Sequence, residues 1–390
     1  MTDLDWINTY SSLGVRLFDL PSFLICILFI AFAGYKYKVP NNYLLVLLLH
    51  CFLPFVLNGV LFDPHYMPDQ FKYWKGVNAI RNGELGFIEA LFGTGNVLEA
   101  SALLSLLPFP RPTSVISLGF YNTFLYIVLF FVLYNKKFFT RVSIWFYLLF
   151  PSAALYSALS LRETLIFFFM TLTIVYARES KPLQSAICLI PLYLIKFQNF
   201  FILVPIVLLY FMLKVSKEGL SLSKSLIIGF VGLFILLSSA PLAIPLLNKS
   251  RVDMYVEDGG NSYEIELISG IGDFIVQGLT SGIYFLSKPM IWEANGLLPL
   301  IQSFENAVIL VILLLITKQA WKKAPDRLAF WLLFLAFSMS IYGLVVFNYG
   351  TAVRYRYPFV IIYVLFVCAD CNIQELLPKR KKITSKYVSY

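Results

Sequence analysis

Three short clusters of polar residues interrupt a very apolar sequence, and each contains an arginine or a lysine. The clusters are Arg162 and Glu163; Lys196 and Asn199; and Arg354, Tyr355 and Arg356. Arginine binds phosphate through two parallel hydrogen bonds. Ionisable groups beside long apolar runs are costly, and they usually face an aqueous cavity or the interior of a helical bundle. We therefore expect these clusters to converge on one anion-binding cavity. Arg251 is a further candidate for this cavity.

A fourth polar segment follows the second apolar run and predicts a short helix. Pro68 suits the first turn of a helix, and Asp69 suits its N-terminus, where the helix dipole favours an anion. On such a helix Asp69, Lys72 and Tyr73 lie on one face, at positions i, i+3 and i+4. A carboxylate, an amine and a phenol on one face can contact a sugar and a phosphate. An alternative is an interfacial helix with Tyr73 and Trp74 in the aromatic belt of a membrane.

The amino-acid composition indicates which kind of structure holds these residues in place. The 390-residue chain is 59% hydrophobic and only 14% charged, whereas a soluble domain is about 25% charged. A chain this apolar needs lipid as its solvent, and in lipid the spanning segments are helices or closed barrels. Barrel strands alternate in hydrophobicity over about ten residues, but here the apolar runs are unbroken and much longer. We predict an all-α, polytopic integral membrane protein with a single transmembrane domain, residues 1–390.

About eleven segments are candidates to cross the membrane, since a span needs roughly 20 apolar residues. The predicted spans are 18–35, 42–62, 114–134, 142–159, 163–177, 183–196, 199–213, 225–246, 299–317, 328–348 and 356–370. Two outer loops, 63–113 and 248–298, are too long for simple connections. We expect surface or re-entrant helices in both loops, including the apolar stretch 274–292, which we do not count as a span.

The positions of lysine and arginine predict the orientation. Of the 31 basic residues, 19 fall in the loops 36–38, 136–141, 178–181, 214–224 and 318–327 or in the tail 371–390. The positive-inside rule makes this side cytoplasmic, so the N-terminus is predicted outside and the C-terminal tail inside. The net charge of +9 then reflects topology and not nucleic-acid binding. The polar clusters described above all fall on the outer side.

We expect neither a metal nor a cofactor. Cys368 and Cys371 form an isolated C-x-x-C pair, and a zinc site needs two more ligands at suitable spacing. Both histidines, His50 and His65, lie far away in the sequence. The chain also lacks a Walker loop, a dinucleotide-binding glycine motif and a serine-hydrolase motif.

These features resemble the Wzy-type O-antigen and capsular polysaccharide polymerases, in particular their EpsG-like branch. The resemblance is carried by Asp69-x-x-x-Tyr73; by Pro151-Ser152, Tyr156-Ser157 and Leu161-Arg162-Glu163; and by Arg354-Tyr355-Arg356-Tyr357-Pro358. The topology fits along nearly the whole chain. One departure is that some polymerases and the related ligases use a histidine or paired arginine-rich outer loops, whereas His65 is the one histidine near this site.

The resemblance implies a metal-independent glycosyltransferase in the bacterial inner membrane, with its active site facing the periplasm. Its donor and acceptor would be undecaprenyl-diphosphate-linked oligosaccharides, and its pathway would include a flippase and a chain-length regulator. Arg162 and Arg354, with help from Arg356, would stabilise the departing diphosphate. Asp69 is the first choice for the general base and Glu163 the second. The expected substrate-binding residues are Lys72, Tyr73, Lys196, Asn199, Arg251, Tyr355 and Arg356.

Two other functions fit part of the pattern. A GT-C-type enzyme that transfers a single sugar from a lipid phosphate usually has a pair of aspartates in an outer loop, and here the acidic residues are isolated. A flippase for lipid-linked oligosaccharides needs charge through the whole bundle, and Glu305 is the main charged residue within a span. Both remain alternatives to the polymerase.

Overall fold

A computed structural model of the chain describes residues 17–58, 60–61, 67–93, 95–215, 244–257 and 259–376. Within these residues the structure is all-helical, as predicted. The helices are α3 (Leu20–Tyr37), α4 (Asn41–Leu57), α5 (Asp69–Arg81), α6 (Phe87–Phe92), α7 (Asn96–Ser105), α8 (Val115–Asn135), α9 (Arg141–Leu149), α10 (Pro151–Ser157), α11 (Glu163–Arg178), α12 (Pro182–Ile195), α13 (Phe197–Val215), α15 (Ile271–Ser287), the 3₁₀ helix η2 (Ile291–Glu293), α16 (Leu297–Lys323), α17 (Pro325–Val345) and α18 (Tyr349–Asp370).

Five of these helices are long and apolar enough to cross a membrane: α3, α8, α16, α17 and α18. The shorter helices α4, α12 and most of α13 are also apolar. The protein is therefore a multi-pass helical membrane protein by length and composition. The number of eleven spans stays a prediction, and most of the predicted span 225–246 lies outside the described residues.

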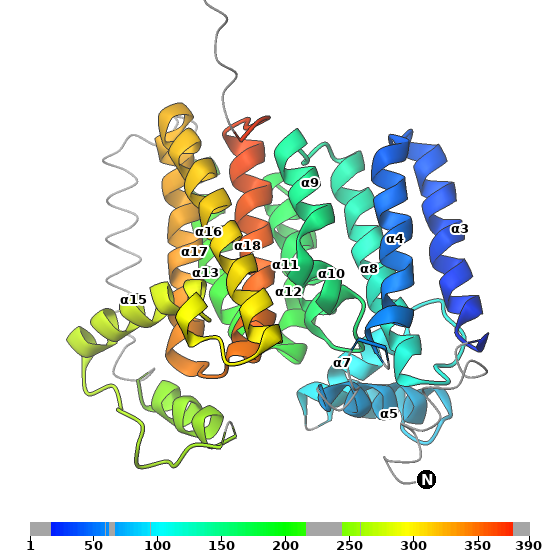
Figure 1. Cartoon of the computed structure of the whole chain (residues 1–390), viewed down its shortest axis with the longest axis horizontal. Coiled ribbons are helices and arrows are strands. Elements are labelled where there is room, and N and C mark those ends of the chain that lie inside the picture. Colours follow the sequence, from blue (N-terminus) through cyan, green and yellow to red (C-terminus); the bar gives the residue numbers. More distant parts are fainter. Residues whose placement is uncertain are drawn as a thin grey trace, which may run out of the picture.

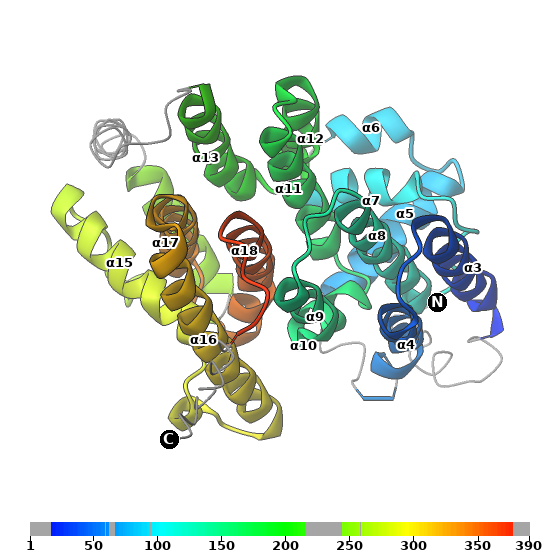
Figure 2. The ribbon, with the colours of Figure 1, turned by 90° about the horizontal axis from the view of Figure 1, so that it is seen from above.

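The long helices stand side by side in one bundle (Figure 1). Figure 2, which looks along the bundle, shows α18 near its middle, between α9 and α11 on one side and α16 and α17 on the other. Most residues of α8 and α18 are buried, whereas most of α3 and α16 face outward. An outward face this apolar is the face that hydrocarbon would cover.

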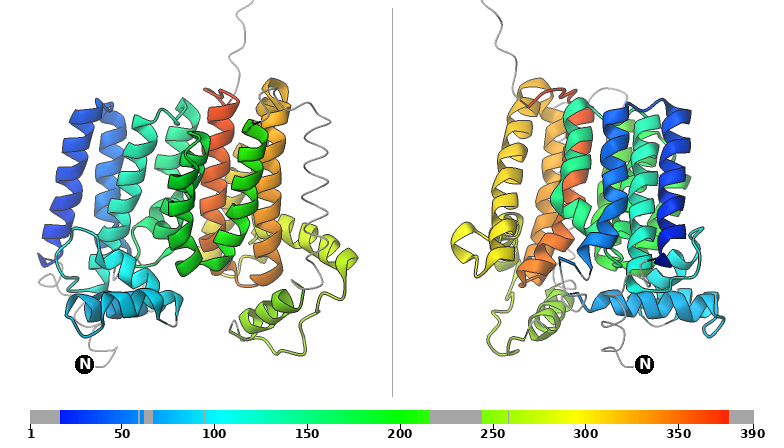
Figure 3. Two further views of the ribbon diagram at one scale, coloured as in Figure 1. Left: turned by 180° about the vertical axis from the view of Figure 1, so that it is seen from behind. Right: turned by 45° about the vertical axis from the view of Figure 1, so that its right-hand side comes forward.

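The basic loops that the structure describes, 36–38, 136–141, 178–181 and 318–327, gather at one end of the bundle, here called the basic end (top of Figure 1). Ion pairs join these loops there, between Lys136 and Glu179 and between Arg178 and Asp370. At the opposite end α5 lies across the bundle, together with α6 and α7 (Figures 1 and 3). As predicted, α5 begins at Asp69. Which end faces the cytoplasm stays a prediction from the positive-inside rule.

The predicted span 142–159 is not one helix. It is divided into α9 and α10 at Phe150, which is extended, because the proline that follows restricts it and cannot continue the hydrogen-bond ladder. After α10, residues 158–162 are non-helical. This interruption places the non-helical segment 158–162, which ends at Arg162, at the end of the bundle opposite the basic loops.

The last span begins earlier than predicted. Residues 349–355, which lie between the predicted spans 328–348 and 356–370, are the first turns of α18, and Pro358 lies inside that helix. The Asn348 side chain accepts hydrogen bonds from the backbone N–H groups of Gly350 and Thr351 and so caps the helix. Arg354 and Arg356 are therefore helical, and side chains two residues apart on a helix do not share a face.

The stretch 274–292 contains α15 and η2, in line with the expectation of helices there. α15 lies obliquely against α17 (Figure 2). The two helices approach closely at Gly282 and Gly343, since a Cβ at Gly343 would lie 2.4 Å from the Ser281 carbonyl oxygen. This contact holds α15 near the end opposite the basic loops.

Candidate functional site

The non-helical segment 158–162 is held in place by side chains of α8. Asn122 Nδ2 donates hydrogen bonds to the carbonyls of Leu159, at 2.6 Å, and Leu161, at 2.5 Å. Thr123 Oγ1 donates to the Ser157 carbonyl at 3.1 Å. Backbone polar groups buried in an apolar bundle must find partners within the protein. These bonds therefore allow an irregular backbone to lead into Arg162.

The start of α5 is attached to the same segment through Gln70. The side-chain amides of Gln70 and Asn58 bond to each other, at 2.9 and 3.2 Å. Gln70 Oε1 also accepts a hydrogen bond from the backbone N–H of Ser160 at 3.1 Å. Asp69, directly before Gln70, is thereby placed close to Arg162 and Glu163, although about 90 residues separate them.

Seven side chains meet at this place, from α5, from the start of α11, from the turn between α12 and α13, and from α18. We call them the Arg354 cluster: Asp69, Tyr73, Arg162, Glu163, Lys196, Arg354 and Tyr355. They include three cations and two carboxylates, so the cluster carries a net positive charge with both carboxylates ionised. All seven were expected from the sequence to lie at the site.

Arg354 lies at the centre of the cluster. Its Nη1 donates to Asp69 Oδ2 at 3.1 Å, and its Nε lies 2.6 Å from Glu163 Oε1. Glu163 is 2% exposed and Arg354 is 12% exposed. One arginine thus joins carboxylates that lie on two different helices.

Lys196 and Arg354 both lie beside the ring of Tyr355. Lys196 Nζ is 4.0 Å from the centroid of the Tyr355 ring, and the Arg354 Cζ atom is 5.6 Å from the same centroid. Cations are attracted to the face of an aromatic ring. Arg162 Nη1 donates to the carbonyl of Ile195, the last residue of α12, at 3.0 Å. Tyr73 is buried and lies within the electrostatic reach of Arg162, Glu163 and Arg354.

Some buried polar atoms of the cluster have no hydrogen bond. They are Nε of Arg162 and Oε2 of Glu163. The other carboxylate oxygen of Glu163 lies 2.6 Å from Arg354 Nε in an ion pair. Buried polar groups are normally hydrogen-bonded. These atoms can therefore bond to a polar molecule that enters the cluster.

Glu99 on α7 was not expected from the sequence. Its Oε2 atom is buried without a hydrogen-bond partner, and it lies within the electrostatic reach of Arg162. Burial raises the pKa of Glu99, and the charge of Arg162 opposes this. In the sequence, Glu99 stands out as an acidic residue within the apolar stretch 86–108. No neighbouring residue links it to Arg162.

Asp69 has the opposite electrostatic environment. Burial would raise its pKa, but the hydrogen bonds and charges of Lys72 and Arg354 outweigh this and hold the pKa below its usual value. Lys72 Nζ lies 2.9 Å from Asp69 Oδ1, and its side chain is 60% exposed. Lys72 therefore contacts the cluster from the solvent side.

Asn199 supports the cluster from inside the bundle. It accepts a hydrogen bond from the Tyr342 hydroxyl, and its Nδ2 donates to Met170 Sδ at 2.8 Å. The ring of Tyr342 lies 5.4 Å from that of Tyr355, between centroids. Because both ends of its amide are used, Asn199 is better suited to positioning than to substrate binding. Tyr342 was not expected from the sequence.

Two expected substrate-binding residues lie elsewhere. Arg356 donates to the carbonyls of Phe285, Leu286 and Lys288, at 2.8 to 2.9 Å, and to Asn306 Oδ1. It therefore caps the C-terminal end of α15, where the helix dipole favours a cation.

Arg251 is likewise engaged away from the cluster. It donates to the Glu266 carbonyl at 2.9 Å and lies 6.0 Å from the Phe347 ring centroid. Arg251 is held by the Glu266 carbonyl and Arg356 by the end of α15. Neither of them therefore joins the Arg354 cluster.

No family model matches the chain, and no curated protein or solved structure matches it either. The resemblance to the Wzy-type polymerases depends on the short motifs around Asp69, Arg162 and Arg354. Function is therefore argued from the chemistry of the Arg354 cluster.

Proposed function

We propose that the protein is a glycosyltransferase that polymerises oligosaccharide repeat units linked to undecaprenyl diphosphate. The reaction would take place at the periplasmic face of a bacterial inner membrane. The observation that carries the proposal is the Arg354 cluster at the end of the bundle opposite the basic loops, where three cations gather beside the buried carboxylate of Glu163 and the partly exposed carboxylate of Asp69. The periplasmic side lacks nucleotide donors, so phosphate groups bound there belong to lipids, including lipid carriers of sugars.

In the proposed reaction, a hydroxyl oxygen of the acceptor repeat unit attacks the anomeric carbon of the donor chain. The bond from that carbon to the lipid diphosphate breaks, and the diphosphate leaves with the electron pair. Negative charge grows on the departing diphosphate, and cations already in place stabilise it. Arg162 and Arg354 take this role: the Arg162 Nε has no hydrogen bond within the protein, and Arg354 lies at the centre of the cluster.

The carboxylates of the cluster would have two tasks. Glu163, paired with Arg354, keeps that guanidinium oriented. A second carboxylate takes the proton that the acceptor hydroxyl releases. Asp69 was the first choice for this base, but its lowered pKa makes it a weaker proton acceptor. Glu99, with a raised pKa and an unbonded oxygen, therefore joins Asp69 and Glu163 as a candidate base.

The position of the charges favours the polymerase over the flippase. A flippase needs polar groups along the whole path through the membrane. Glu305 and Arg356 lie within the bundle, but both are bound to backbone groups at helix ends: Glu305 Oε1 accepts from the Ser152 N–H at 2.8 Å, and Arg356 caps α15. A single-sugar transferase would use a similar cluster, and it is distinguished by its product.

The test is a gel of surface polysaccharide from cells in which the gene is deleted and then complemented. Deletion should leave lipid capped with single repeat units and no long chains. Arg162→Ala or Arg354→Lys should likewise abolish long chains at a normal protein level, because neither provides the guanidinium fork in its place. Lys38→Gln, an exposed basic residue at the basic end, is the matched control and should retain long chains.

Normal ladders from both arginine variants would remove the diphosphate-binding role. Loss of every repeat unit on deletion would instead indicate a flippase or an early transferase. A product with one added sugar, and no polymer, would indicate the single-sugar enzyme.

A further inference from the structure

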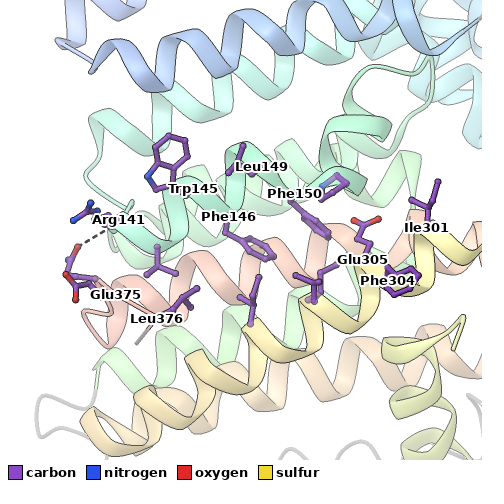
Figure 4. Close-up of a pocket in the computed structure, with 16 residues that line it drawn as sticks. Arg141, Trp145, Phe146, Leu149, Phe150, Ile301, Phe304, Glu305, Glu375 and Leu376 are labelled. Atoms are coloured by element: carbon purple, nitrogen blue, oxygen red, sulfur yellow. Dashed lines mark hydrogen bonds between the residues drawn. The ribbon is translucent and has the colours of Figure 1, made fainter. Parts of the chain in front are cut away.

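A long apolar groove lies on the side of the bundle between α9 and α16, with a volume of about 980 Å³ (Figure 4). Trp145, Phe146 and Leu149 line one wall, and Phe304 and Val308 line the other. No residue of the Arg354 cluster is among its lining residues. The groove is therefore separate from the proposed reaction site.

The groove opens to the side of the bundle. Leu149 is 59% exposed, Phe304 56% and Val308 59%. In a membrane protein, apolar residues exposed on the side of the spanning helices face hydrocarbon. An apolar hollow does not retain water and takes up apolar ligands. Hydrocarbon chains are thus the matching occupant.

The two ends of the groove differ in charge. Arg141, at the start of α9, lies at the basic end, and its backbone N–H donates to Gln374 Oε1 at 3.2 Å. Among the described residues no carboxylate forms an ion pair with the Arg141 guanidinium. Glu375 lines the same end. Toward the other end the groove contains Glu305 (Figure 4).

The wall formed by α9 has nearly the length of one leaflet. From Arg141 to Leu149 it rises by about 12 Å, at roughly 1.5 Å per residue. The hydrocarbon core of a bilayer is about 30 Å thick, so this wall covers somewhat less than half of it, beginning at the basic end.

We propose that this groove binds one phospholipid of the leaflet at the basic end, with its phosphate on the Arg141 guanidinium and an acyl chain between α9 and α16. Arginine provides paired donors to a phosphate. The carboxylate of Glu305 would repel a diphosphate entering from the other end, which disfavours the lipid-linked substrate as occupant. The inference does not depend on the proposed glycosyltransferase activity.

The test is native mass spectrometry of the full-length protein, purified in detergent and titrated with phosphatidylethanolamine. The unmodified protein should retain one tightly bound phospholipid. Arg141→Gln should weaken that binding about fivefold, the effect of one basic residue near a lipid headgroup. Leu149→Trp, which fills the groove from an exposed position, should abolish it. Lys38→Gln, at the same end but away from the groove, is the matched control and should bind as the unmodified protein does.

Equal retention by Arg141→Gln, Leu149→Trp and the unmodified protein would overturn the proposal. Val308→Trp, on the opposite wall, provides a second block of the groove in case Leu149→Trp does not fold. Displacement of the bound phospholipid by undecaprenyl diphosphate, with no effect of Arg141→Gln, would also overturn it, because the groove would then hold the substrate lipid.

Discussion

Arg354 and Arg356 are two residues apart on α18, yet they lie in two different environments. Arg354 is paired with side-chain carboxylates, Asp69 on α5 and Glu163 on α11. Arg356 is buried and donates to three backbone carbonyls and to Asn306. The same residue type thus belongs to a candidate reaction site in one case and caps a helix in the other.

The difference between the two arginines lies in their partners. Backbone carbonyls at the end of α15 need a donor at all times, because a buried carbonyl without one costs free energy. The carboxylates beside Arg354 are side-chain groups, so the guanidinium can exchange part of its pairing for a phosphate without leaving a helix end uncapped. We therefore expect Arg354 variants to affect activity and Arg356 variants to affect stability.

The largest effect is expected for Arg354→Gln. Loss of a charged donor placed at a developing negative charge typically lowers the rate about 100-fold or more. The rate should be measured as polymer formed by purified protein from lipid-linked repeat units, with the thermal unfolding midpoint as a check on folding.

Removing Arg354 leaves Glu163 buried without its partner, so Arg354→Gln alone also lowers the stability of the folded protein. The double variant Arg354→Gln/Glu163→Gln removes both charges and is the control: it should fold normally and stay inactive. A double variant with normal activity would exclude Arg354 from the reaction.

Arg356→Gln should mainly lower stability, by about 2–4 kcal/mol, because the carbonyls at the end of α15 lose their donors. We expect a lower unfolding midpoint in detergent and less protein in the membrane, with activity per folded molecule largely retained. Arg356→Lys, which keeps a cation at this helix end, should lose less. An inactive Arg356→Gln protein with an unchanged midpoint would place Arg356 in the site.

Glu163→Gln should have an intermediate effect, since it removes the charge that orients Arg354 and keeps the shape of the side chain. A misoriented catalytic group typically lowers the rate about 10-fold to 100-fold. The comparison is Glu305→Gln, near Arg356, which retains an acceptor for the Ser152 N–H and should be nearly as active as the unmodified protein. Equal losses in the two variants would show that the two environments do not differ as proposed.

The smallest effect is expected for a change of pH, measured as the stability of α5. The pKa of Asp69 is lowered in the folded protein, so the stabilisation from its pairing is complete above its unfolded pKa of about 3.9 and is lost as the pH falls through the lower folded value. The protection factors for hydrogen exchange in α5, which are corrected for the pH dependence of intrinsic amide exchange, should therefore be insensitive to this group between about pH 8 and pH 5. A change with a midpoint inside that range, absent in Asp69→Asn, would contradict the assigned pairing.

Much of the fold could be predicted from local sequence. The apolar runs predicted most of the long helices, and Pro68 with Asp69 predicted the start of α5. Prediction failed where one residue altered a regular pattern: Pro151 divides a predicted span, and Asn348 starts α18 earlier than predicted. In both cases the local signal was present, but the apolar pattern alone did not reveal the boundary.

The sequence by itself determined that the protein is helical and apolar, that basic loops and polar clusters occupy different parts of the chain, and that arginines are available to bind an anion. Only the tertiary structure decided which arginine serves which purpose. Asp69 and Arg354 are separated by 285 residues, and Glu99 lies near Arg162 only because α7 packs at the same end of the bundle. Helix periodicity turns Arg354 and Arg356 to different sides of α18, but their partners depend on how distant helices cross, which local sequence does not encode.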